Sequence, residues 1–449
     1  MISPARVAAY EILSAISAGS ADLPTAIAFA RTSVQDDRDR ALAAEIATGV
    51  QRSRNALDHL ITAFSKRAID RVDREVVEIL RLSAYQLLHL DRAPASAVVD
   101  DAVNLVRRAG KRSAAGFVNA VLRTLSRKRR NLPLPVRPSD LNNRTAVLDY
   151  LSVTLSHPRW LAARWHDRLG LEKAEAWMAF NNAPAPLTLR PNRLRTTPAA
   201  LVARLAQQDV RVRPGDFAPD ALIVEEGHPL RGISDDFVVQ DEASQLVALL
   251  ADPQAGARVL DACASPGGKT TAMAATLAGT GLLVACDVRG RRMELLRRTL
   301  SQAGANRVRL VQADMLMSLP FSRPFDLVLV DAPCSGLGTL RRDPDIRWRR
   351  LEGDLSTLAA AQLTMLQRAA EVVAAGGRLI YATCSSEPEE NEAVVSAFLA
   401  AAPGFAPVDA RDSAPRLPSA VVDARGHLRT DPATHRLESF FGAVFQRMR

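Results

Sequence analysis

Cysteine is scarce in this sequence, and long apolar runs are absent. Only four cysteines occur among 449 residues, and none stands in a Cys-x-x-Cys pair. Neither a disulfide framework nor a bound metal is therefore indicated, and a reducing cytoplasm is the compartment that we expect. No uninterrupted apolar stretch reaches the ~20 residues that cross a bilayer, and Glu11 interrupts the only N-terminal stretch that could act as a secretion signal. We accordingly expect no association with a membrane.

The composition is that of an ordinary globular protein with an excess of positive charge. Hydrophobic residues make up 47% and charged residues 24%, which excludes a mainly disordered or fibrous chain. Lysine and arginine exceed aspartate and glutamate by 58 to 49, which makes a polyanionic partner electrostatically plausible. An arginine-rich composition alone explains the same excess, so charge leaves nucleic-acid binding open. The length predicts roughly two to four domains.

Residues 1–130 have the periodicity of successive helices. Apolar residues share one face at helical spacing, for example Val76, Leu80, Ala84, Leu87 and Leu88. This pattern predicts an all-helical domain. Two basic clusters close the segment: Arg107, Arg108, Lys111 and Arg112, then Arg127, Lys128, Arg129 and Arg130. Solvated helix ends and a phosphate-binding face explain such clusters equally well.

Proline marks the end of the helical domain. Pro133, Pro135 and Pro138 predict an extended linker over residues 131–145, because proline breaks helices. Residues 146–240 combine helical patterns with short strand-like runs, which predicts a small intermediate α/β module. We expect residues 241–449 to form a further domain, which carries the remaining motifs.

Apolar runs alternate with helical stretches from residue 257 onward. The runs are Arg258–Asp261, Leu282–Asp287, Val308–Val311, Phe325–Asp331 and Arg378–Ala382. This alternation predicts a Rossmann-like α/β domain in which helices cover both faces of a parallel sheet. Ligands bind such sheets beyond the carboxyl ends of the strands. The residues after each run are therefore the candidates for a functional site.

The first run leads into a glycine-containing loop, Asp261-Ala-Cys-Ala-Ser-Pro-Gly-Gly-Lys-Thr270. Gly267 and Gly268 allow the backbone to approach a ligand closely and to open a helix, which indicates a nucleotide-like ligand. A phosphate-binding loop of the form Gly-x-x-x-x-Gly-Lys-Ser/Thr requires glycine at position 263, where this chain has Cys263. A kinase or ATPase is therefore not favoured.

Acidic residues follow the other strands. Asp287 ends the second run at the spacing where a carboxylate accepts hydrogen bonds from both ribose hydroxyls of an adenosine. Asp314 follows the third run, and Asp331 ends the fourth. Because these acids recur at successive strand ends, helix capping alone explains them poorly. The glycine-containing turn does not by itself distinguish S-adenosylmethionine from NAD.

Two cysteines distinguish the possible chemistries. Cys334 lies in Asp331-Ala-Pro-Cys-Ser-Gly336 and Cys384 in Tyr381-Ala-Thr-Cys-Ser385, so both follow predicted strands. That position favours reactive thiolates, whereas we expect Cys263 and Cys286 to be structural. Carbon 5 of cytosine is a poor nucleophile until a thiolate adds at carbon 6, after which it can attack a sulfonium methyl group. Asp331 is the candidate to contact N3 of the base, and the residues alone leave the two cysteines interchangeable as nucleophile.

These motifs resemble the Sun (Fmu) group of RNA cytosine-5 methyltransferases, in particular the bacterial enzymes that modify 16S ribosomal RNA. The likeness covers nearly the whole chain. Gln240-Asp-Glu-Ala-Ser-Gln245 resembles the segment that leads into the family's catalytic domain, and the motifs at Asp261, Asp287, Asp314, Asp331 and Cys384 follow in the family's order and spacing. It implies S-adenosylmethionine as cofactor, small-subunit ribosomal RNA as partner, and a catalytic sheet of about seven strands. We expect a monomer.

The resemblance also assigns roles to the site residues. Cys384 would be the nucleophile, Cys334 would assist product release, and Asp331 would contact the base. Contacts to the cofactor or base would come from Cys263, Ala264, Ser265, Pro266, Gly267, Gly268, Lys269, Asp287, Asp314 and Asp331.

The helical domain resembles the antitermination factor NusB at Phe117–Arg123 and at Arg92-Ala-Pro94, which implies contact with RNA. One departure is Glu438-Ser-Phe-Phe441, where the methyltransferase family commonly has Asp-Gly-Phe-Phe. Two other functions remain open. One is a non-catalytic RNA adaptor that retains the methyltransferase fold as a scaffold, and the other is a DNA cytosine-5 methyltransferase.

Overall fold

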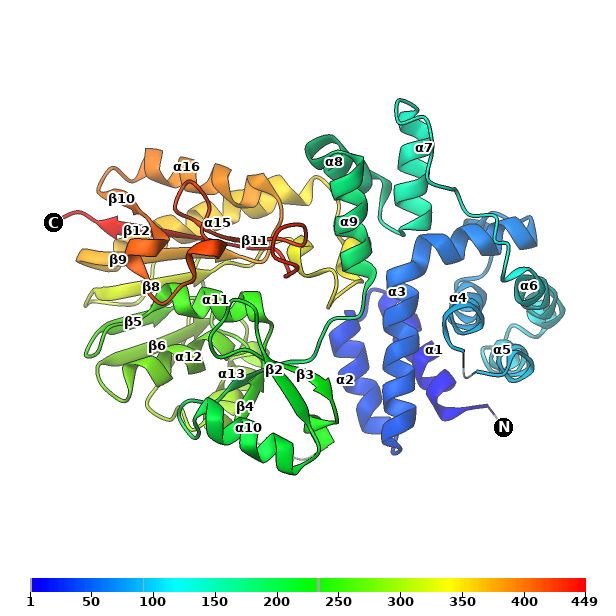
Figure 1. Ribbon diagram of the computed structural model, residues 1–449, viewed down its shortest axis with the longest axis horizontal. Coiled ribbons are helices and arrows are strands. Elements are labelled where there is room, and N and C mark those ends of the chain that lie inside the picture. The colour runs from blue at the N-terminus through cyan, green and yellow to red at the C-terminus, as the bar shows by residue number, and fades with distance from the viewer. Residues whose placement is uncertain (1, 92, 232–234) are drawn as a thin grey trace. The chain divides into compact units, whose positions relative to one another are not determined.

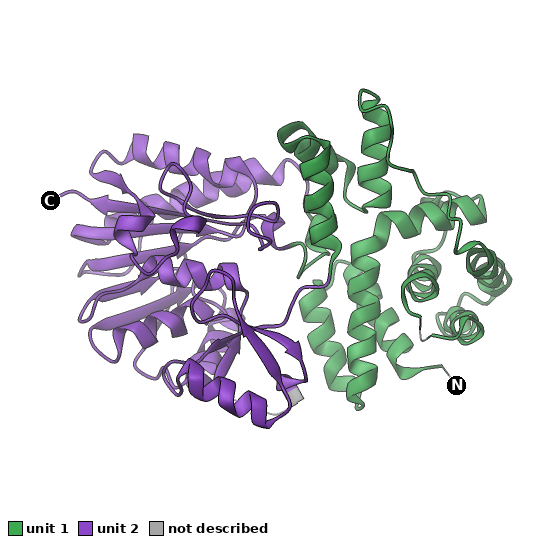
Figure 2. Ribbon diagram, in the orientation of Figure 1, with its two compact units in different colours: residues 1–183, 340–350 green, residues 184–339, 351–449 purple. Residues whose placement is uncertain are grey.

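The computed structural model describes residues 2–91, 93–231 and 235–449. Arg92, which begins the expected Arg-Ala-Pro segment, lies outside the described residues. The chain divides into two compact units, which are coloured separately in Figure 2. Unit 1 comprises Met1–Ala183 and Leu340–Arg350, and unit 2 comprises Pro184–Thr339 and Leu351–Arg449.

Unit 1 is helical, as the apolar periodicity predicts. Its elements are α1 (Pro4–Ser17), α2 (Leu23–Ser33), α3 (Asp37–Ser65), η1 (Ile69–Arg71), α4 (Arg74–His89), α5 (Ala95–Arg108), η2 (Arg112–Ala114), α6 (Ala115–Lys128), α7 (Arg144–Asp149), η3 (Tyr150–Thr154), α8 (Arg159–Leu169), α9 (Leu171–Asn182) and α14 (Ile346–Arg349). Asp22 begins α2 by accepting a hydrogen bond from the backbone of Thr25. Helices α1 to α6 enclose one apolar core around Ile46, Leu80 and Leu105 (Figure 1).

The proline-rich segment 131–145 lies within unit 1, where it packs against the helices. Leu132 and Leu134 contact the apolar core, and the carbonyl oxygen of Pro135 accepts a hydrogen bond from Thr154 Oγ1 at 2.6 Å. These contacts hold the segment, which the prolines predicted to be a linker, against the helices of unit 1. The chain passes from unit 1 to unit 2 between Ala183 and Pro184.

Unit 1 is completed by a short segment from far along the chain, residues 340–350. Arg347 is fully buried and donates hydrogen bonds to the carbonyl oxygen of Ser156 at 3.0 Å and to Asn182 Oδ1 at 2.8 Å. Asp345, also fully buried, accepts a hydrogen bond from the backbone of Leu23 at 3.0 Å. Nothing in the local pattern of this segment predicted that it belongs to the helical unit.

Unit 2 begins with a small antiparallel sheet. Its strands are β1 (Thr188–Pro191), β2 (Arg211–Pro214), β3 (Leu222–Glu226) and β4 (Phe237–Val239), in the order β2-β3-β1-β4, and α10 (Pro198–Gln207) and η4 (Pro229–Arg231) lie between them in the chain. The boundary between the two compact units falls within the segment 146–240, which we expected to form one module. Helices α8 and α9 belong to unit 1, and the four strands belong to unit 2.

A larger mixed sheet forms the rest of unit 2. Its strands are β5 (Arg258–Asp261), β6 (Leu282–Asp287), β7 (Arg309–Gln312), β8 (Phe325–Asp331), β9 (Val373–Thr383), β10 (Phe405–Val408), β11 (Leu428–Thr430) and β12 (Phe440–Arg447). The order is β10-β12-β9-β8-β5-β6-β7, and β11 pairs with β12. Strands β5 to β9 are parallel, whereas β12 runs antiparallel to β9. The predicted α/β domain is confirmed.

Helices cover both faces of this sheet, which explains its continuously apolar strands. The helices and turns are α11 (Glu242–Ala251), α12 (Gly268–Leu277), α13 (Gly290–Ala303), η5 (Leu337–Thr339), α15 (Asp354–Glu371), η6 (Pro388–Glu390), α16 (Glu392–Ala401), α17 (Ala410–Ser413) and η7 (Ser419–Val421). Leu327 and Leu329 pack with α11 and α12, and the alternate residues Val328 and Val330 pack with α15 and α16 (Figure 1). Each strand therefore buries both of its faces.

Candidate active site

The candidate site lies at the carboxyl edge of the parallel strands. Strand order reverses between β5 and β8, since the chain builds β6 and β7 on one side of β5 before it adds β8 and β9 on the other. Such a reversal is where open α/β sheets bind ligands. Asp261 ends β5 and Asp331 ends β8, so two carboxylates flank the reversal.

A cavity of about 310 Å³ occupies this edge. It is lined by Val238, Val239, Gln240, Ser244, Asp261, Cys263, Ala264, Ser265, Pro266, Gly268, Lys269, Thr299 and Asp331. The volume lies at the lower end of the roughly 300–1,000 Å³ typical of ligand pockets. Gly267 is not among the lining residues. It immediately precedes α12 and has a backbone φ of +112°, which residues other than glycine rarely adopt.

Lys269 and Asp331 form an ion pair in the cavity wall. Lys269 Nζ lies 2.6 Å from Asp331 Oδ2. Burial disfavours the charge of Lys269, but the neighbouring Asp331 carboxylate outweighs burial and raises the pKa of Lys269. The ammonium group of Lys269 is thereby held next to Asp331, at the point where the strand order reverses.

Asp261 is buried and lines the same cavity as this ion pair. It accepts a hydrogen bond from Thr270 Oγ1 at 2.7 Å. Burial raises the pKa of Asp261 to about 7, and the charge of Asp331 acts in the same direction. Asp261 therefore changes protonation near neutral pH.

The other two acids expected to contact the ligand lie outside the cavity lining. Asp287 is buried at the end of β6 and pairs with Arg292 Nε at 3.1 Å. Arg292 also donates to the carbonyl oxygen of Ser265 at 2.8 Å, so it connects Asp287 to the glycine-containing loop. Asp314 is exposed beyond β7 and accepts a hydrogen bond from the backbone of Leu316.

The two candidate cysteines lie side by side. Cys334 follows β8 and Cys384 follows β9, and their sulfur atoms are 3.2 Å apart. The hydrogen bond with Cys384, together with burial, raises the pKa of Cys334 well above its ordinary value. Cys286 is fully buried in the core, and burial raises its pKa to about 12. Cys263 lines the cavity, and burial raises its pKa as well.

Arg190 is a site residue that the sequence analysis missed. This buried side chain of β1 donates to Gln240 Oε1 at 2.6 Å, to the carbonyl oxygen of Gly268 at 2.7 Å and to Thr271 Oγ1 at 2.7 Å. It thus anchors the start of α12 to the small sheet. An arginine in a short strand carries no signal of this role, because its partners are distant in the sequence.

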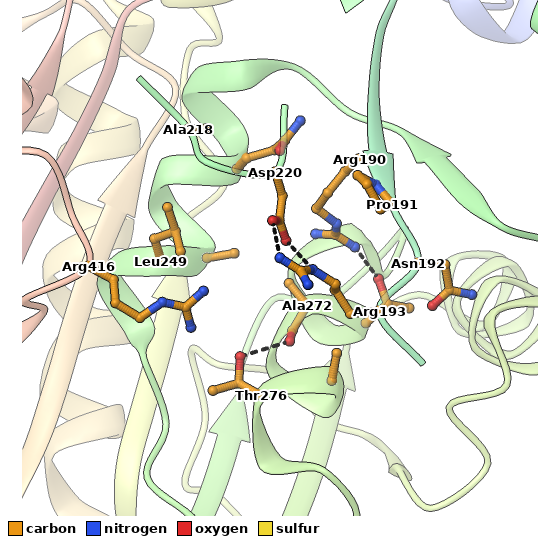
Figure 3. A pocket seen from close by; sticks show the side chains of 14 residues that line it. Arg190, Pro191, Asn192, Arg193, Ala218, Asp220, Leu249, Ala272, Thr276 and Arg416 are labelled. Atoms are coloured by element: carbon orange, nitrogen blue, oxygen red, sulfur yellow. Dashed lines mark hydrogen bonds and ion pairs between the residues drawn. The ribbon is translucent and has the colours of Figure 1, made fainter. Parts of the chain in front are cut away.

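Arg190 also lines a second cavity of about 270 Å³, shown in Figure 3. Side chains of α11 and α12 contribute to its wall, and Arg193 closes part of it through a bidentate pair with Asp220, at 2.6 and 2.9 Å. The carboxylate and guanidinium of this pair satisfy each other, as Figure 3 shows.

Glu390 is the second site residue that the sequence analysis missed. Its fully buried carboxylate accepts hydrogen bonds from the backbone of Ser335 at 2.7 Å and from Ser385 Oγ at 2.5 Å. These serines directly follow Cys334 and Cys384. Its only signal in the sequence is the Glu-Asn-Glu run that begins at this residue, six residues after Cys384.

The described ranges contain neither a candidate metal-binding cluster nor a candidate membrane-spanning helix. In residues 2–91, 93–231 and 235–449, no cluster of three or more His, Cys, Asp or Glu side chains is arranged to hold a metal ion. The helices within those same ranges include none with the length and apolar character of a membrane span.

Three family models match the chain. One described as "16S rRNA methyltransferase RsmB/F" matches residues 248–446, one described as "NusB family" matches residues 3–127, and one described as "Methyltr_RsmF/B-like, ferredoxin-like domain" matches residues 157–231.

Relatives from other bacteria match this chain over most of their length. The chain is 33% identical over 377 residues to the "Probable ribosomal RNA small subunit methyltransferase B" of Bacillus subtilis, which covers 83% of this chain and 82% of that protein. It is 35% identical over 414 residues to the "Ribosomal RNA small subunit methyltransferase B" of Pseudomonas putida, covering 90% and 91%. The crystal structure of PH0851 superimposes with a TM-score of 0.82 at 25% identity, covering 100% of this chain and 99% of that one.

Proposed function

The chain belongs to the RsmB/F family of 16S rRNA methyltransferases, and from this premise we propose that it transfers a methyl group from S-adenosylmethionine to carbon 5 of a cytosine in 16S ribosomal RNA. The observation that carries the proposal is the pair of cysteine sulfurs 3.2 Å apart, on loops that follow neighbouring strands. One of these loops begins at Asp331, which lines the cavity. Cytosine-5 chemistry requires such a thiolate next to a methyl donor.

The cavity has the chemistry to hold S-adenosylmethionine. The carboxylates of Asp261 and Asp331 suit a positively charged sulfonium, and Gly268 leaves the backbone at the start of α12 open to a ligand. When bound, this cofactor supplies an activated methyl group. We assign its binding to residues 263–269, with Asp287 holding the loop through Arg292 and Asp314 contributing from the end of β7.

We assign Cys384 as the nucleophile. Its thiolate adds to carbon 6 of the cytosine, which gives carbon 5 the electron density to accept the methyl group. Asp331 contacts N3 of the same base, and its carboxylate stabilises the N–H that forms when N3 takes up a proton from solvent during addition. Lys269 fixes the orientation of Asp331 through their 2.6 Å ion pair.

Cys334 assists release of the product. Water takes the proton from carbon 5, the electrons of that C–H bond restore the double bond between carbons 5 and 6, and Cys384 Sγ leaves carbon 6 as a thiolate. A thiol at Cys334, 3.2 Å away, can donate a hydrogen bond to that thiolate and stabilise it. The target base must be unstacked to reach the site, since carbon 6 is shielded within a helix.

The helical domain of residues 1–130 contacts the RNA in this proposal. Arg127, Lys128, Arg129 and Arg130 are exposed at the end of α6, where they can reach phosphates. The cluster of Arg107, Arg108, Lys111 and Arg112 has less positive charge available for phosphates, because Lys111 Nζ forms an ion pair with Asp73 at 2.8 Å.

Methyl transfer to protein-free 16S ribosomal RNA tests the function. Purified protein with labelled S-adenosylmethionine should produce 5-methylcytosine, and Cys384→Ala should abolish both transfer and the covalent protein–RNA complex. Binding of RNA without binding of S-adenosylmethionine would instead indicate an adaptor. Transfer to duplex DNA in preference to RNA would indicate a DNA methyltransferase.

A further inference from the structure

Glu390 connects the two cysteine loops through one buried carboxylate. Oε1 accepts hydrogen bonds from the backbone N–H of Ser335 at 2.7 Å and from Gln362 Nε2 at 2.9 Å. Oε2 accepts from Ser385 Oγ at 2.5 Å. The hydroxyl oxygens of Ser335 and Ser385 are themselves 3.1 Å apart. One side chain therefore fixes the residue after each cysteine.

A second layer holds this carboxylate in place. Gln362 Nε2 also donates to the carbonyl oxygen of Pro333 at 3.0 Å, on the other side of Cys334. The hydroxyl of Tyr381 contacts both Gln362 Oε1, at 3.0 Å, and the backbone carbonyl of Glu390, at 2.5 Å. The geometry around Cys334 is thus fixed from both sides.

Charge is distributed unevenly around the cysteine pair. Lys269 interacts electrostatically with Cys384, whereas the charge of Glu390 acts on Cys334. Within the described residues, no lysine or arginine forms an ion pair with Glu390, so only N–H and O–H groups offset its charge. A proton shared by the two sulfurs therefore has a positive neighbour on one side and a negative neighbour on the other.

The remaining charged and titratable groups do not reverse this asymmetry. Asp331 forms an ion pair with Lys269, so each of these two charges offsets part of the other. Burial, followed by the charges of Cys334 and Glu390, raises the pKa of Tyr381 far above its usual value, so Tyr381 stays neutral. The backbone N–H of Gly336 lowers the pKa of Cys334, but the contact with Cys384, burial and Glu390 together raise it.

We propose that Glu390 is a positioning residue that keeps the shared proton on Cys334 and so selects Cys384 as the attacking sulfur. The proposal rests on the proposed function, because it explains which of two adjacent thiols adds to the base. A thiolate at Cys334 is disfavoured because the buried carboxylate of Glu390 lies next to it. The S–H group of Cys334 then donates a hydrogen bond to the Cys384 thiolate before addition and again when the product leaves.

Glu390→Gln tests the charge while it retains the shape. The amide oxygen still accepts from Ser335 and Gln362, and the hydroxyl of Ser385 can rotate to accept from the amide nitrogen. Glu371→Gln, an exposed change at the end of α15, is the matched control. Alkylation by iodoacetamide over a range of pH, read by peptide mass spectrometry, reports Cys334 and Cys384 separately.

In Glu390→Gln we expect the apparent pKa of Cys334 to fall, because a nearby like charge is removed. The ratio of labelled Cys334 to labelled Cys384 at neutral pH should therefore rise roughly tenfold. The kcat for methyl transfer should fall by about 10- to 100-fold, with a smaller change in KM. Glu371→Gln should match the wild type in all three readings.

The outcomes separate this inference from the function on which it rests. An unchanged labelling ratio in a folded Glu390→Gln variant, with the RNA still attached through Cys384, would overturn the inference alone. If the wild-type protein attaches RNA through Cys334 or forms no complex, the proposed function fails first. Thermal melting of both variants verifies folding, and the milder Glu390→Asp variant, which keeps the charge, should retain the wild-type labelling ratio.

Discussion

The backbone N–H of Gly338 donates a hydrogen bond to the carbonyl oxygen of Cys384 at 3.0 Å. The carbonyl oxygen of Gly338 in turn accepts a hydrogen bond from the backbone of Ser439 at 2.9 Å. Gly338 therefore lies between the loop of the proposed nucleophile and the residue that precedes β12. The Glu438-Ser-Phe-Phe441 segment, which departs from the family pattern, still forms the closing strand, in which Phe441 pairs with Thr383.

Gly338→Ala should disrupt this arrangement. An alanine Cβ would lie 2.0 Å from the carbonyl oxygen of Ser439 and 2.8 Å from that of Cys384, and both are backbone atoms that cannot rotate away. We expect a loss of about 1–3 kcal/mol in unfolding free energy, typical of overpacking, and a loss of methyl transfer. Gly353→Ala is the control, because no atom lies within 4 Å of its Cβ. Equal stability of the two variants by denaturant unfolding would contradict this packing.

Cys334→Ala should trap the protein on its RNA. Without the thiol beside Cys384 Sγ, the departing sulfur loses its hydrogen-bond donor, so release should become slower than attack. We expect a covalent complex that survives denaturing gel electrophoresis and accumulates at least several-fold over the wild type. The double variant with Cys384→Ala should form none. A complex that forms only when Cys334 is present would reverse the two roles.

Arg190→Gln should weaken cofactor binding. The change removes the hydrogen bonds that join Gln240, Gly268 and Thr271 at the start of α12, where the cofactor loop ends. We expect the Kd for S-adenosylmethionine, measured by calorimetry, to rise by about tenfold, the effect of losing roughly 1.4 kcal/mol. Arg193→Gln, which breaks only the pair with Asp220, should leave that Kd near the wild-type value.

Asp261 should make stability depend on pH in the acidic to neutral range. Its folded-state pKa of about 7 lies above its ordinary value of 3.8, so the protonated form stabilises the fold. This contribution is complete below about pH 4 and is lost as the pH rises through about 7. Asp261→Asn stays neutral throughout. The Tm of the wild type relative to this variant should therefore fall by at least about 3 °C between pH 5 and pH 8; a constant difference would contradict the shift.

Replacing Arg127, Lys128 and Arg129 with glutamine should weaken RNA binding. Each lost phosphate contact should reduce the slope of log affinity against log salt by about 0.7 to 0.9. Binding of S-adenosylmethionine should not change, because these residues lie outside the catalytic domain. An unaltered salt dependence in filter binding would place the RNA-contacting surface elsewhere.

The sequence was sufficient for the elements whose signals are local. All five predicted apolar runs became strands β5 to β9, because residues such as Val328 and Leu329 face opposite helical layers and must both be apolar. The motif positions at strand ends also placed Asp261, Asp331 and the two cysteines at one edge, since parallel strands end together.

The contacts between those motifs could not be read in the same way. Glu390 lies 55 residues from Ser335, and Arg190 lies 78 residues from Gly268, so their hydrogen bonds exist only after the sheet forms. A buried carboxylate and an exposed one look alike in a sequence. The contacts of the proline-rich segment were hidden for a related reason, because proline content does not show that Leu132 and Leu134 pack against the apolar core.

The segment 340–350 gives unit 1 a particular order of assembly during synthesis. Residues 1–130 hold most of one apolar core and can complete it as soon as they leave the ribosome. Helices α8 and α9 must wait, because Arg347, which fills the space beside Ser156 and Asn182, is translated 191 residues after Ser156. Four of the eight strands of the catalytic sheet, β5 to β8, are therefore already synthesised before the last part of the helical unit can close.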